Sequence, residues 1–140
     1  MNDPRPHDAD AEAHAEISAY KSRDGLQRIW RATGYSWAGL KAALRYEAAF
    51  RQEVALGLVL VVASFWVAGT PLQWAALVGV VLLVWIVELL NSAIEALADG
   101  VTIETHPMIG RAKDIGSAAV MLSLVLVVLT WGAVIVERWG

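Results

Sequence analysis

Three carboxylates, Glu88, Glu95 and Asp99, recur at helical spacing in a largely apolar stretch, with Asn91 and Ser92 beside them. At about 100° per residue these side chains share one polar stripe, which extends roughly 16 Å along a helix. Carboxylates at membrane depth are costly unless they are neutral, paired or facing a wet cavity. Three kinds of site meet this condition: a metal-assisted catalytic site, an ion or proton pathway of a small transporter, and a polar seam between helices.

Two basic residues follow this stripe in the segment 110–117. Arg111 and Lys113 lie at the predicted start of the last helix, where free amide groups and the positive dipole end favour phosphate. Carboxylates suited to Mg²⁺ near a phosphate site are the components of phosphoryl transfer, so the combination favours an enzyme. No familiar nucleotide motif is present: the lysine of 34–41 comes one position too late for a P-loop, and there is no HRD or DFG set.

The elements that must position these residues are predicted to be membrane-spanning helices. The chain has 140 residues, is 57% hydrophobic, and carries no Asp, Glu, Lys or Arg in 54–87 or 115–136. One crossing needs about 20 apolar residues, and Gly69, Thr70 and Pro71 divide the first stretch. We therefore expect an all-α membrane protein and not a soluble core. Its spans are predicted at about 54–69, 72–99 and 115–139.

A polar N-terminal region precedes the spans. Residues 1–24 contain two prolines and are expected to form a disordered tail before a membrane domain at 25–140. Residues 25–53 are predicted to form an amphipathic helix on the membrane surface; a helix that packs on a soluble partner is the alternative. If this helix continues, Glu47 and Arg51 turn toward its apolar side. That apolar stripe comprises Leu26, Ile29, Trp30, Thr33, Trp37, Leu40 and Leu44.

The basic residues predict the orientation in the membrane. Eight of the eleven Lys and Arg residues precede the first span and two lie in the loop 99–114, whereas Arg138 alone falls on the other side. The positive-inside rule therefore places the N-terminus and this loop in the cytoplasm. The chain has no cysteine, which excludes thiolate chemistry and disulfides. An aromatic belt near the outer face is expected from Trp66, Trp74, Trp131 and Trp139.

Four motifs closely resemble the bacterial integral-membrane diacylglycerol kinases. They are GYSW at 34–37, EAAFRQE at 47–53, ELLNSAIE at 88–95 and GRAKDIGSAAV at 110–120. The similarity extends from about Leu26 to the C-terminus, in the family's order and spacing. It implies a homotrimer in the bacterial inner membrane that uses MgATP to phosphorylate diacylglycerol to phosphatidic acid.

The resemblance also implies a role for each matching residue. Glu88 would be the general base, Asn91 would orient the site, and Glu47 and Glu95 would hold Mg²⁺ and contact the nucleotide. Further nucleotide contacts would come from Arg28, Tyr35, Glu104, His106, Lys113 and Asp114. The lipid side would be lined by Arg28, Ser36, Trp37, Phe50, Arg51, Glu53, Glu88 and Ser117.

Two other functions compete with this prediction. Within the family, an undecaprenol kinase would use the same chemistry on an isoprenoid alcohol, but the motif at 110–119 looks closer to the diacylglycerol branch. Outside it, a small transporter could use Glu88 as a proton carrier, without a Mg²⁺ site or phosphate-facing bases. Three helices can hardly enclose a polar site alone, so a homo-oligomer is expected on physical grounds. No nucleic-acid partner is expected.

Overall fold

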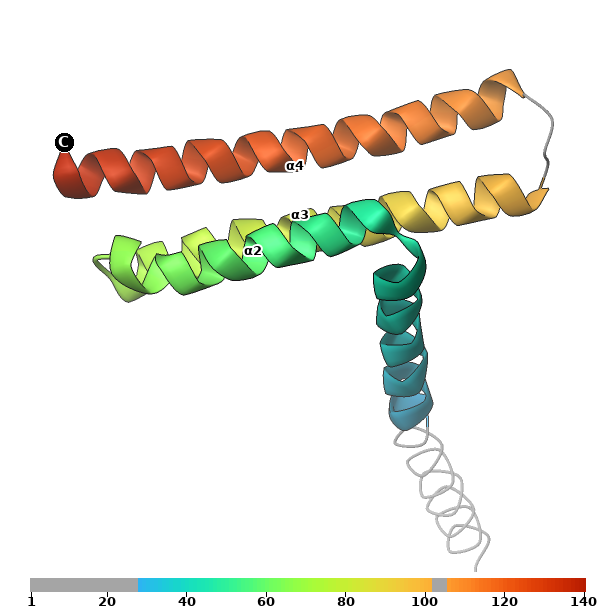
Figure 1. Ribbon diagram of the computed structural model, residues 1–140, viewed down its shortest axis with the longest axis horizontal. Helices are drawn as coiled ribbons and strands as arrows, with labels where there is room; N and C mark the ends of the chain where they lie inside the picture. The colour runs from blue at the N-terminus through green and yellow to red at the C-terminus, as the bar shows by residue number, and fades with distance from the viewer. Residues whose placement is uncertain (1–27, 102–105) are drawn as a thin grey trace, which may run out of the picture. The chain divides into compact units, whose positions relative to one another are not determined.

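The computed structural model describes residues 28–101 and 106–140, and all regular secondary structure in these ranges is helical. Residues 28–46 form one helix. It is followed by α2 (Ala48–Val67), α3 (Pro71–Val101) and α4 (Pro107–Trp139), which are coloured from green to red in Figure 1. The predicted all-α class is confirmed. The predicted tail at 1–24 lies outside the described residues.

Three of these helices are long and apolar enough to cross a membrane. They contain 20, 31 and 33 residues, and at 1.5 Å per residue even the shortest covers a hydrocarbon core of about 30 Å. The three predicted spans are therefore confirmed as candidate membrane helices.

The boundary between the first helix and α2 differs from the prediction. The helix expected at 25–53 ends at residue 46, and α2 begins at Ala48, because Glu47 has an extended backbone with φ −95° and ψ 110°. The Arg51 guanidinium folds back across the break and donates to the carbonyl oxygens of Arg45 (3.2 Å) and Leu44 (3.5 Å). These carbonyls at the helix end thus gain a side-chain partner. Arg51 therefore does not turn inward on a continuous helix.

The turn between α2 and α3 lies where Gly69, Thr70 and Pro71 predicted it. Pro71 begins α3, and Thr70 Oγ1 accepts a hydrogen bond from the Gln73 N–H at 3.2 Å, as an N-cap residue does. Gln73 Nε2 also donates to Glu137 Oε2 of α4 at 3.0 Å. This bond joins the turn to the C-terminal end of α4.

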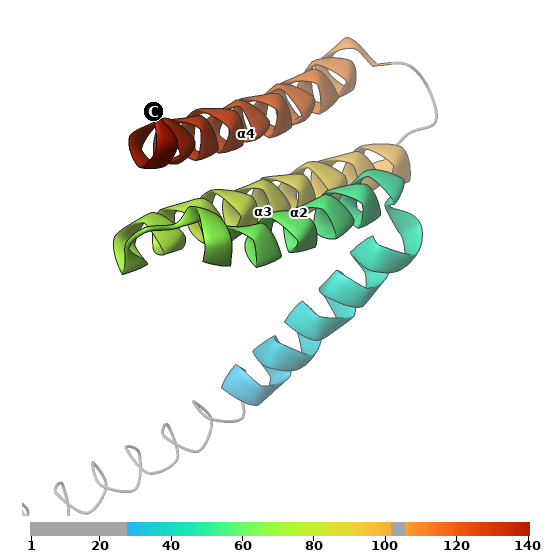
Figure 2. The same cartoon turned by 60° about the vertical axis from the view of Figure 1, so that its left-hand side comes forward.

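Helix α3 packs against both α2 and α4, as two views show (Figures 1 and 2). A small apolar cluster of Leu77, Trp131 and Val134 forms between α3 and α4. Trp131 is only 8% exposed, so its assignment to an aromatic belt is wrong: the indole is an interior packing group. Trp66 and Trp139, by contrast, are largely exposed.

Many apolar side chains on the outer faces of the spans remain uncovered. Examples are Leu58 and Phe65 on α2 and Leu122 and Val128 on α4, each more than half exposed. The predicted apolar stripe of the helix 28–46 is exposed as well, including Trp30 and Trp37. Large contiguous apolar surface of this kind requires lipid or partner subunits.

Candidate active site

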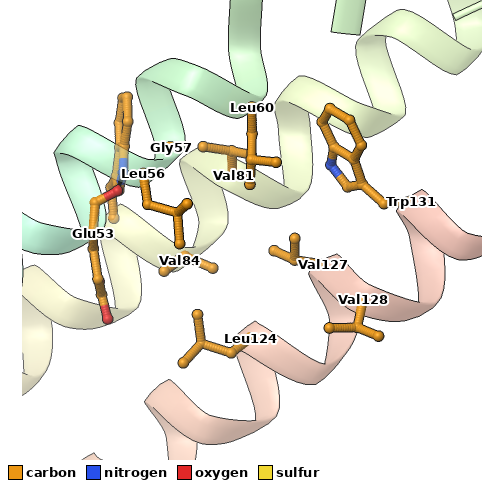
Figure 3. Close-up of a pocket in the computed structure, with 11 residues that line it drawn as sticks. Glu53, Leu56, Gly57, Leu60, Val81, Val84, Leu124, Val127, Val128 and Trp131 are labelled. Atoms are coloured by element: carbon orange, nitrogen blue, oxygen red, sulfur yellow. Dashed lines mark hydrogen bonds between the residues drawn. The ribbon is translucent and has the colours of Figure 1, made fainter. Parts of the chain in front are cut away.

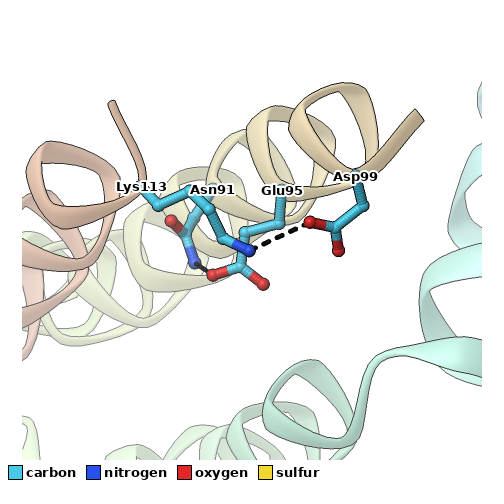
Figure 4. A network of polar contacts seen from close by, with 4 residues as sticks. All are labelled: Asn91, Glu95, Asp99 and Lys113. Carbon is cyan, nitrogen blue, oxygen red and sulfur yellow. Dashed lines mark hydrogen bonds and ion pairs between the residues drawn. The ribbon is translucent and has the colours of Figure 1, made fainter. Parts of the chain in front are cut away.

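The polar stripe of α3 is buried at its centre. Glu88 is 4% exposed, and Asn91 and Ser92 are also buried. Asn91 Nδ2 donates to Glu95 Oε1 at 3.4 Å, which links two members of the stripe along one helix face (Figure 4). Within the described chain, Asn91 Oδ1 and Ser92 Oγ are buried without a hydrogen-bond partner. Buried polar atoms without partners are costly, so the packing around this face comes at an energetic cost.

Carboxylates from α2 join this stripe. Glu88 lies close enough to Glu47, Glu53 and Glu95 for their charges to act on it. Glu47 stands at the break before α2 and Glu53 in the second turn of that helix. The fold therefore brings Glu47 and Glu53 to the carboxylates of α3.

Helix α4 approaches the stripe through a glycine. A Cβ atom on Gly116 would collide with Asn91 Oδ1, because the backbone of Gly116 packs directly against the Asn91 side chain. The buried Asn91 amide is therefore held between Glu95 on its own helix and the backbone of α4. This contact brings the N-terminal half of α4 against the acidic face of α3.

The basic residues occupy a different position from the predicted one. Helix α4 begins at Pro107, so Arg111 and Lys113 lie within its first two turns and not in a loop at the start of a helix. Lys113 Nζ contacts Asp99 Oδ1 at 3.1 Å and so connects the two helices (Figure 4). Asp114 is exposed on α4. The free amide groups expected near residue 115 are therefore inside the helix and already bonded.

The true N-terminus of α4 is capped by His106. Its Nδ1 accepts a hydrogen bond from the Met108 N–H at 3.3 Å, and Pro107 occupies the first helical position. Glu104, predicted to contact nucleotide, lies outside the described residues.

The residues predicted to line the lipid side occupy three different environments. Phe50 is buried at the start of α2, Arg51 is engaged with carbonyls of the preceding helix, and Ser117 is exposed on α4. On the helix 28–46, Ser36 Oγ donates to Ala32 O at 3.0 Å. Arg28, Tyr35, Ser36 and Trp37 are all exposed on that helix.

Glu53 lies in the wall of an apolar cavity of about 360 Å³. The cavity is lined by α2, α3 and α4 and is open on one side, and Glu53 is the only charged residue in its lining (Figure 3). The other lining residues are Leu56, Gly57, Leu60, Val81, Val84, Trp85, Leu124, Val127, Val128 and Trp131. Its size and apolar walls suit part of an acyl chain.

Comparison with known proteins decides the family. Residues 34–135 match the family model of the prokaryotic diacylglycerol kinases. A diacylglycerol kinase of Pseudomonas aeruginosa is 48% identical over 118 residues, which cover 84% of this chain and 96% of the relative. The diacylglycerol kinase of Escherichia coli strain K12 is 47% identical over 116 residues, covering 83% and 95%. That of Helicobacter pylori strain 26695 is 41% identical over 108 residues, covering 77% and 84%.

The chain belongs to the prokaryotic diacylglycerol kinase family.

Membership in the diacylglycerol kinase family confirms the resemblance drawn from the four motifs. It makes the chain an ATP-dependent lipid kinase of the membrane and favours neither a transporter nor an undecaprenol kinase. All four motifs lie within the matched part of the chain. The individual site residues are assigned below as proposals.

The carboxylates of this diacylglycerol kinase family member suit a magnesium–nucleotide complex better than a bare metal ion. Among the described residues, no three His, Cys, Asp or Glu side chains converge on one metal position. Mg²⁺ usually takes only one or two protein carboxylates and completes its octahedron with waters and substrate phosphates. The neighbouring acids Glu47, Glu88 and Glu95 offer the carboxylate oxygens that such an ion binds.

Sequence reasoning missed Trp85 and Gly57, which meet where α2 and α3 pack. Trp85 Nε1 donates to the backbone carbonyl of Glu53 at 3.1 Å. A Cβ atom on Gly57 would lie 2.7 Å from the Trp85 ring. A small residue in one span and a bulky one in the next is the only signal available from sequence, and it does not show which residues pair.

Proposed function

We propose that the chain transfers the γ-phosphate of MgATP to the hydroxyl group of diacylglycerol, giving phosphatidic acid, with Glu88 as the general base. The observation that carries this proposal is the position of Glu88. It is buried on α3, in the part of the chain that matches the family, and three other carboxylates lie nearby. A diacylglycerol hydroxyl resides at the interface, so its base must lie at that depth.

Glu88 acts by accepting a proton. As the lipid oxygen bonds to the γ-phosphorus, the hydroxyl proton passes to the Glu88 carboxylate and the bond from phosphorus to the ADP oxygen breaks. General base catalysis of this kind contributes about 10²–10⁴-fold to the rate. Asn91 supports this step, because its amide is held between Glu95 and Gly116.

Glu47 and Glu95 hold the metal in this proposal. When bound, Mg²⁺ would supply positive charge to the phosphates. Glu47 stands at the break before α2, where the extended backbone turns it away from a regular helix position. Glu95 lies two turns beyond Glu88 on α3. The two carboxylates thus come from different parts of the chain.

In this proposal Lys113 releases the Asp99 carboxylate and binds a phosphate group of the nucleotide in its place. Its partner Asp99 is 73% exposed, and an exposed ion pair is worth only about 0–1 kcal/mol. A phosphate group can therefore displace Asp99 at little cost. The remaining proposed nucleotide contacts are Arg28, Tyr35, Glu104, His106 and Asp114. The proposed lipid contacts are Arg28, Ser36, Trp37, Phe50, Arg51, Glu53, Glu88 and Ser117.

The proposed setting is the bacterial inner membrane, with the N-terminus in the cytoplasm and a homotrimer as the working unit. The bias of Lys and Arg toward the N-terminal side supports the orientation. The exposed apolar faces of α2 and α4 support assembly.

The direct test measures labelled phosphatidic acid. Purified protein in detergent micelles is supplied with labelled ATP, Mg²⁺ and dioleoylglycerol, and undecaprenol replaces the acceptor in a parallel assay. We expect Glu88→Gln to lower turnover by about a hundredfold or more, while binding of a fluorescent ATP analogue is retained. Glu137→Gln, near the C-terminal end of α4, makes the same change of side chain outside the proposed site and serves as the matched control. Near-normal turnover of Glu88→Gln would remove Glu88 as the base.

A further inference from the structure

We propose that Trp85 is a positioning residue for the lipid side of the site. Its indole N–H holds the turn of α2 that carries Glu53 against the turn of α3 that carries Glu88. Gly57 leaves the space that the indole ring occupies. This inference rests on the proposed function, because it assigns Glu53 to the lipid acceptor.

The contact itself joins residues that lie 32 positions apart. Trp85 Nε1 donates to the backbone oxygen of Glu53 at 3.1 Å, in a partly buried setting. In an apolar environment a hydrogen bond to a main-chain carbonyl is strong, and its loss leaves a buried donor without a partner. The bond therefore fixes the depth of this turn of α2 relative to α3.

Gly57 makes the contact sterically possible. A Cβ atom at this position would lie 2.7 Å from both Cζ2 and Nε1 of Trp85 and 2.8 Å from Val81 Cγ1. Distances below 3.0 Å are too short for a real Cβ atom, so any larger residue must displace the indole or the helix. Gly57 follows Glu53 by one helical turn, so the space for the ring and the acceptor for its N–H lie together.

Glu53, the residue that Trp85 positions, carries a buried carboxyl oxygen. Glu53 Oε2 is buried and has no hydrogen-bond partner within the described ranges, and Glu53 lines the apolar cavity (Figure 3). A carboxyl group in such a wall is costly unless a donor meets it. In a lipid with a hydroxyl head and an apolar chain, the hydroxyl group can donate a hydrogen bond to Glu53 and the chain can fill the cavity. Its hydroxyl would then be held between Glu53 and Glu88.

Trp85 also precedes Glu88 by three residues, which places the two on adjacent turns of the same side of α3. A shift of the Trp85–Glu53 contact therefore changes the spacing between Glu53 and Glu88. Lipid binding should respond to such a shift. Nucleotide binding should respond less, because Glu47 stands at the break before α2, Glu95 lies two turns beyond Glu88, and Lys113 is on α4.

The test uses Trp85→Phe, which keeps an aromatic ring and removes the N–H. Initial rates are measured against the mole fraction of dioleoylglycerol at saturating MgATP, and against MgATP at saturating lipid. We expect the KM for lipid to rise about fivefold, the change for one hydrogen bond of about 1 kcal/mol. The KM for MgATP should change less than the KM for lipid, and the Tm in detergent should match that of the control Trp66→Phe, whose ring is 69% exposed.

Two further variants separate positioning from general packing. Gly57→Ala should raise the lipid KM in the same direction, whereas Gly79→Ala should not, because a Cβ atom there meets nothing within 4 Å. If Trp85 acts through Glu53, adding Trp85→Phe to Glu53→Gln should cause no further rise in the lipid KM. Full additivity of the two changes would overturn the proposal.

Other outcomes are equally decisive. An unchanged lipid KM in Trp85→Phe, or parallel changes in both KM values and Tm, would reduce Trp85 to a packing residue. That failure is distinct from failure of the proposed function, which appears as an inactive wild type or an active Glu88→Gln in the same assay.

Discussion

Glu95 is a member of the acidic cluster whose carboxylate accepts a hydrogen bond from a neighbouring side chain. One carboxylate oxygen lies 3.4 Å from Asn91 Nδ2, and the side chain is only partly buried. Asn91 is in turn confined by Gly116. A carboxylate oriented in this way by an amide is suited to hold a metal, because outer-shell contacts fix the direction of the ligand oxygen.

Removing this carboxylate should weaken the dependence on metal. For Glu95→Ala we expect the Mg²⁺ concentration at half-maximal rate to rise by about tenfold or more, since even outer-shell changes cost 10–100-fold in metal affinity. Initial rates titrated with Mg²⁺ at fixed ATP provide the measurement. Glu137→Ala, at the far end of α4, should leave the titration unchanged. An unaltered titration for Glu95→Ala would exclude Glu95 as a metal ligand.

At the scale of elements, two glycines set how closely the spans approach. Gly57 brings α2 onto Trp85 of α3, and Gly116 brings α4 onto Asn91 of the same helix. Small residues at helix contacts are the usual means of close packing in membranes, where apolar burial does not drive helices together. The central helix α3 thus receives its functional neighbours through backbone contacts on both sides.

A side chain at position 116 should therefore disturb the site. Gly116→Ala adds a Cβ atom where Asn91 Oδ1 already lies, so either the amide or α4 must move. We expect a loss of about 1–3 kcal/mol in the free energy of unfolding, as for other overpacked interiors, together with reduced turnover. Thermal unfolding in detergent and initial rates measure these effects.

Gly110→Ala is the matched control for this variant. It also lies on α4, and a Cβ atom there meets nothing within 4 Å. Both variants gain the same helix propensity, about 1 kcal/mol, so their difference isolates the contact with Asn91. Equal stability and activity of the two would contradict the close approach as a functional constraint.

At the scale of the whole molecule, the described part of the chain exposes much apolar surface, which fits the proposed trimer. Phe65, Leu122 and Val128 are exposed, and the cluster draws residues from only two of the three spans. Lipid can cover apolar faces but cannot satisfy carboxylates. Neighbouring subunits can do both.

Chemical crosslinking should accordingly reveal an oligomer. In mild detergent, glutaraldehyde treatment is expected to yield dimer and trimer bands, since a trimer joined by partial crosslinking gives both. Protein unfolded in sodium dodecyl sulfate before treatment is the control and should remain monomeric. A single monomer band from the mild-detergent sample would count against the trimer.

Much of the fold was predictable because local patterns encode it. Two charge-free stretches and the Gly69-Thr70-Pro71 turn located the three spans, and the spacing of Glu88, Asn91 and Glu95 placed them on one helix face. Four motifs indicated the family that the comparisons confirm. These features depend on residues close in sequence, where helical periodicity and hydropathy determine the outcome.

The tertiary structure alone decided how those helices meet. The helix break at Glu47, the start of α4 at Pro107 and the burial of Trp131 all differ from the prediction. The Trp85–Glu53 hydrogen bond and the Gly116–Asn91 contact join residues many turns apart. Periodicity reports which face of a helix is polar, but only packing decides which partner that face receives, because many pairs of apolar helices satisfy the same pattern.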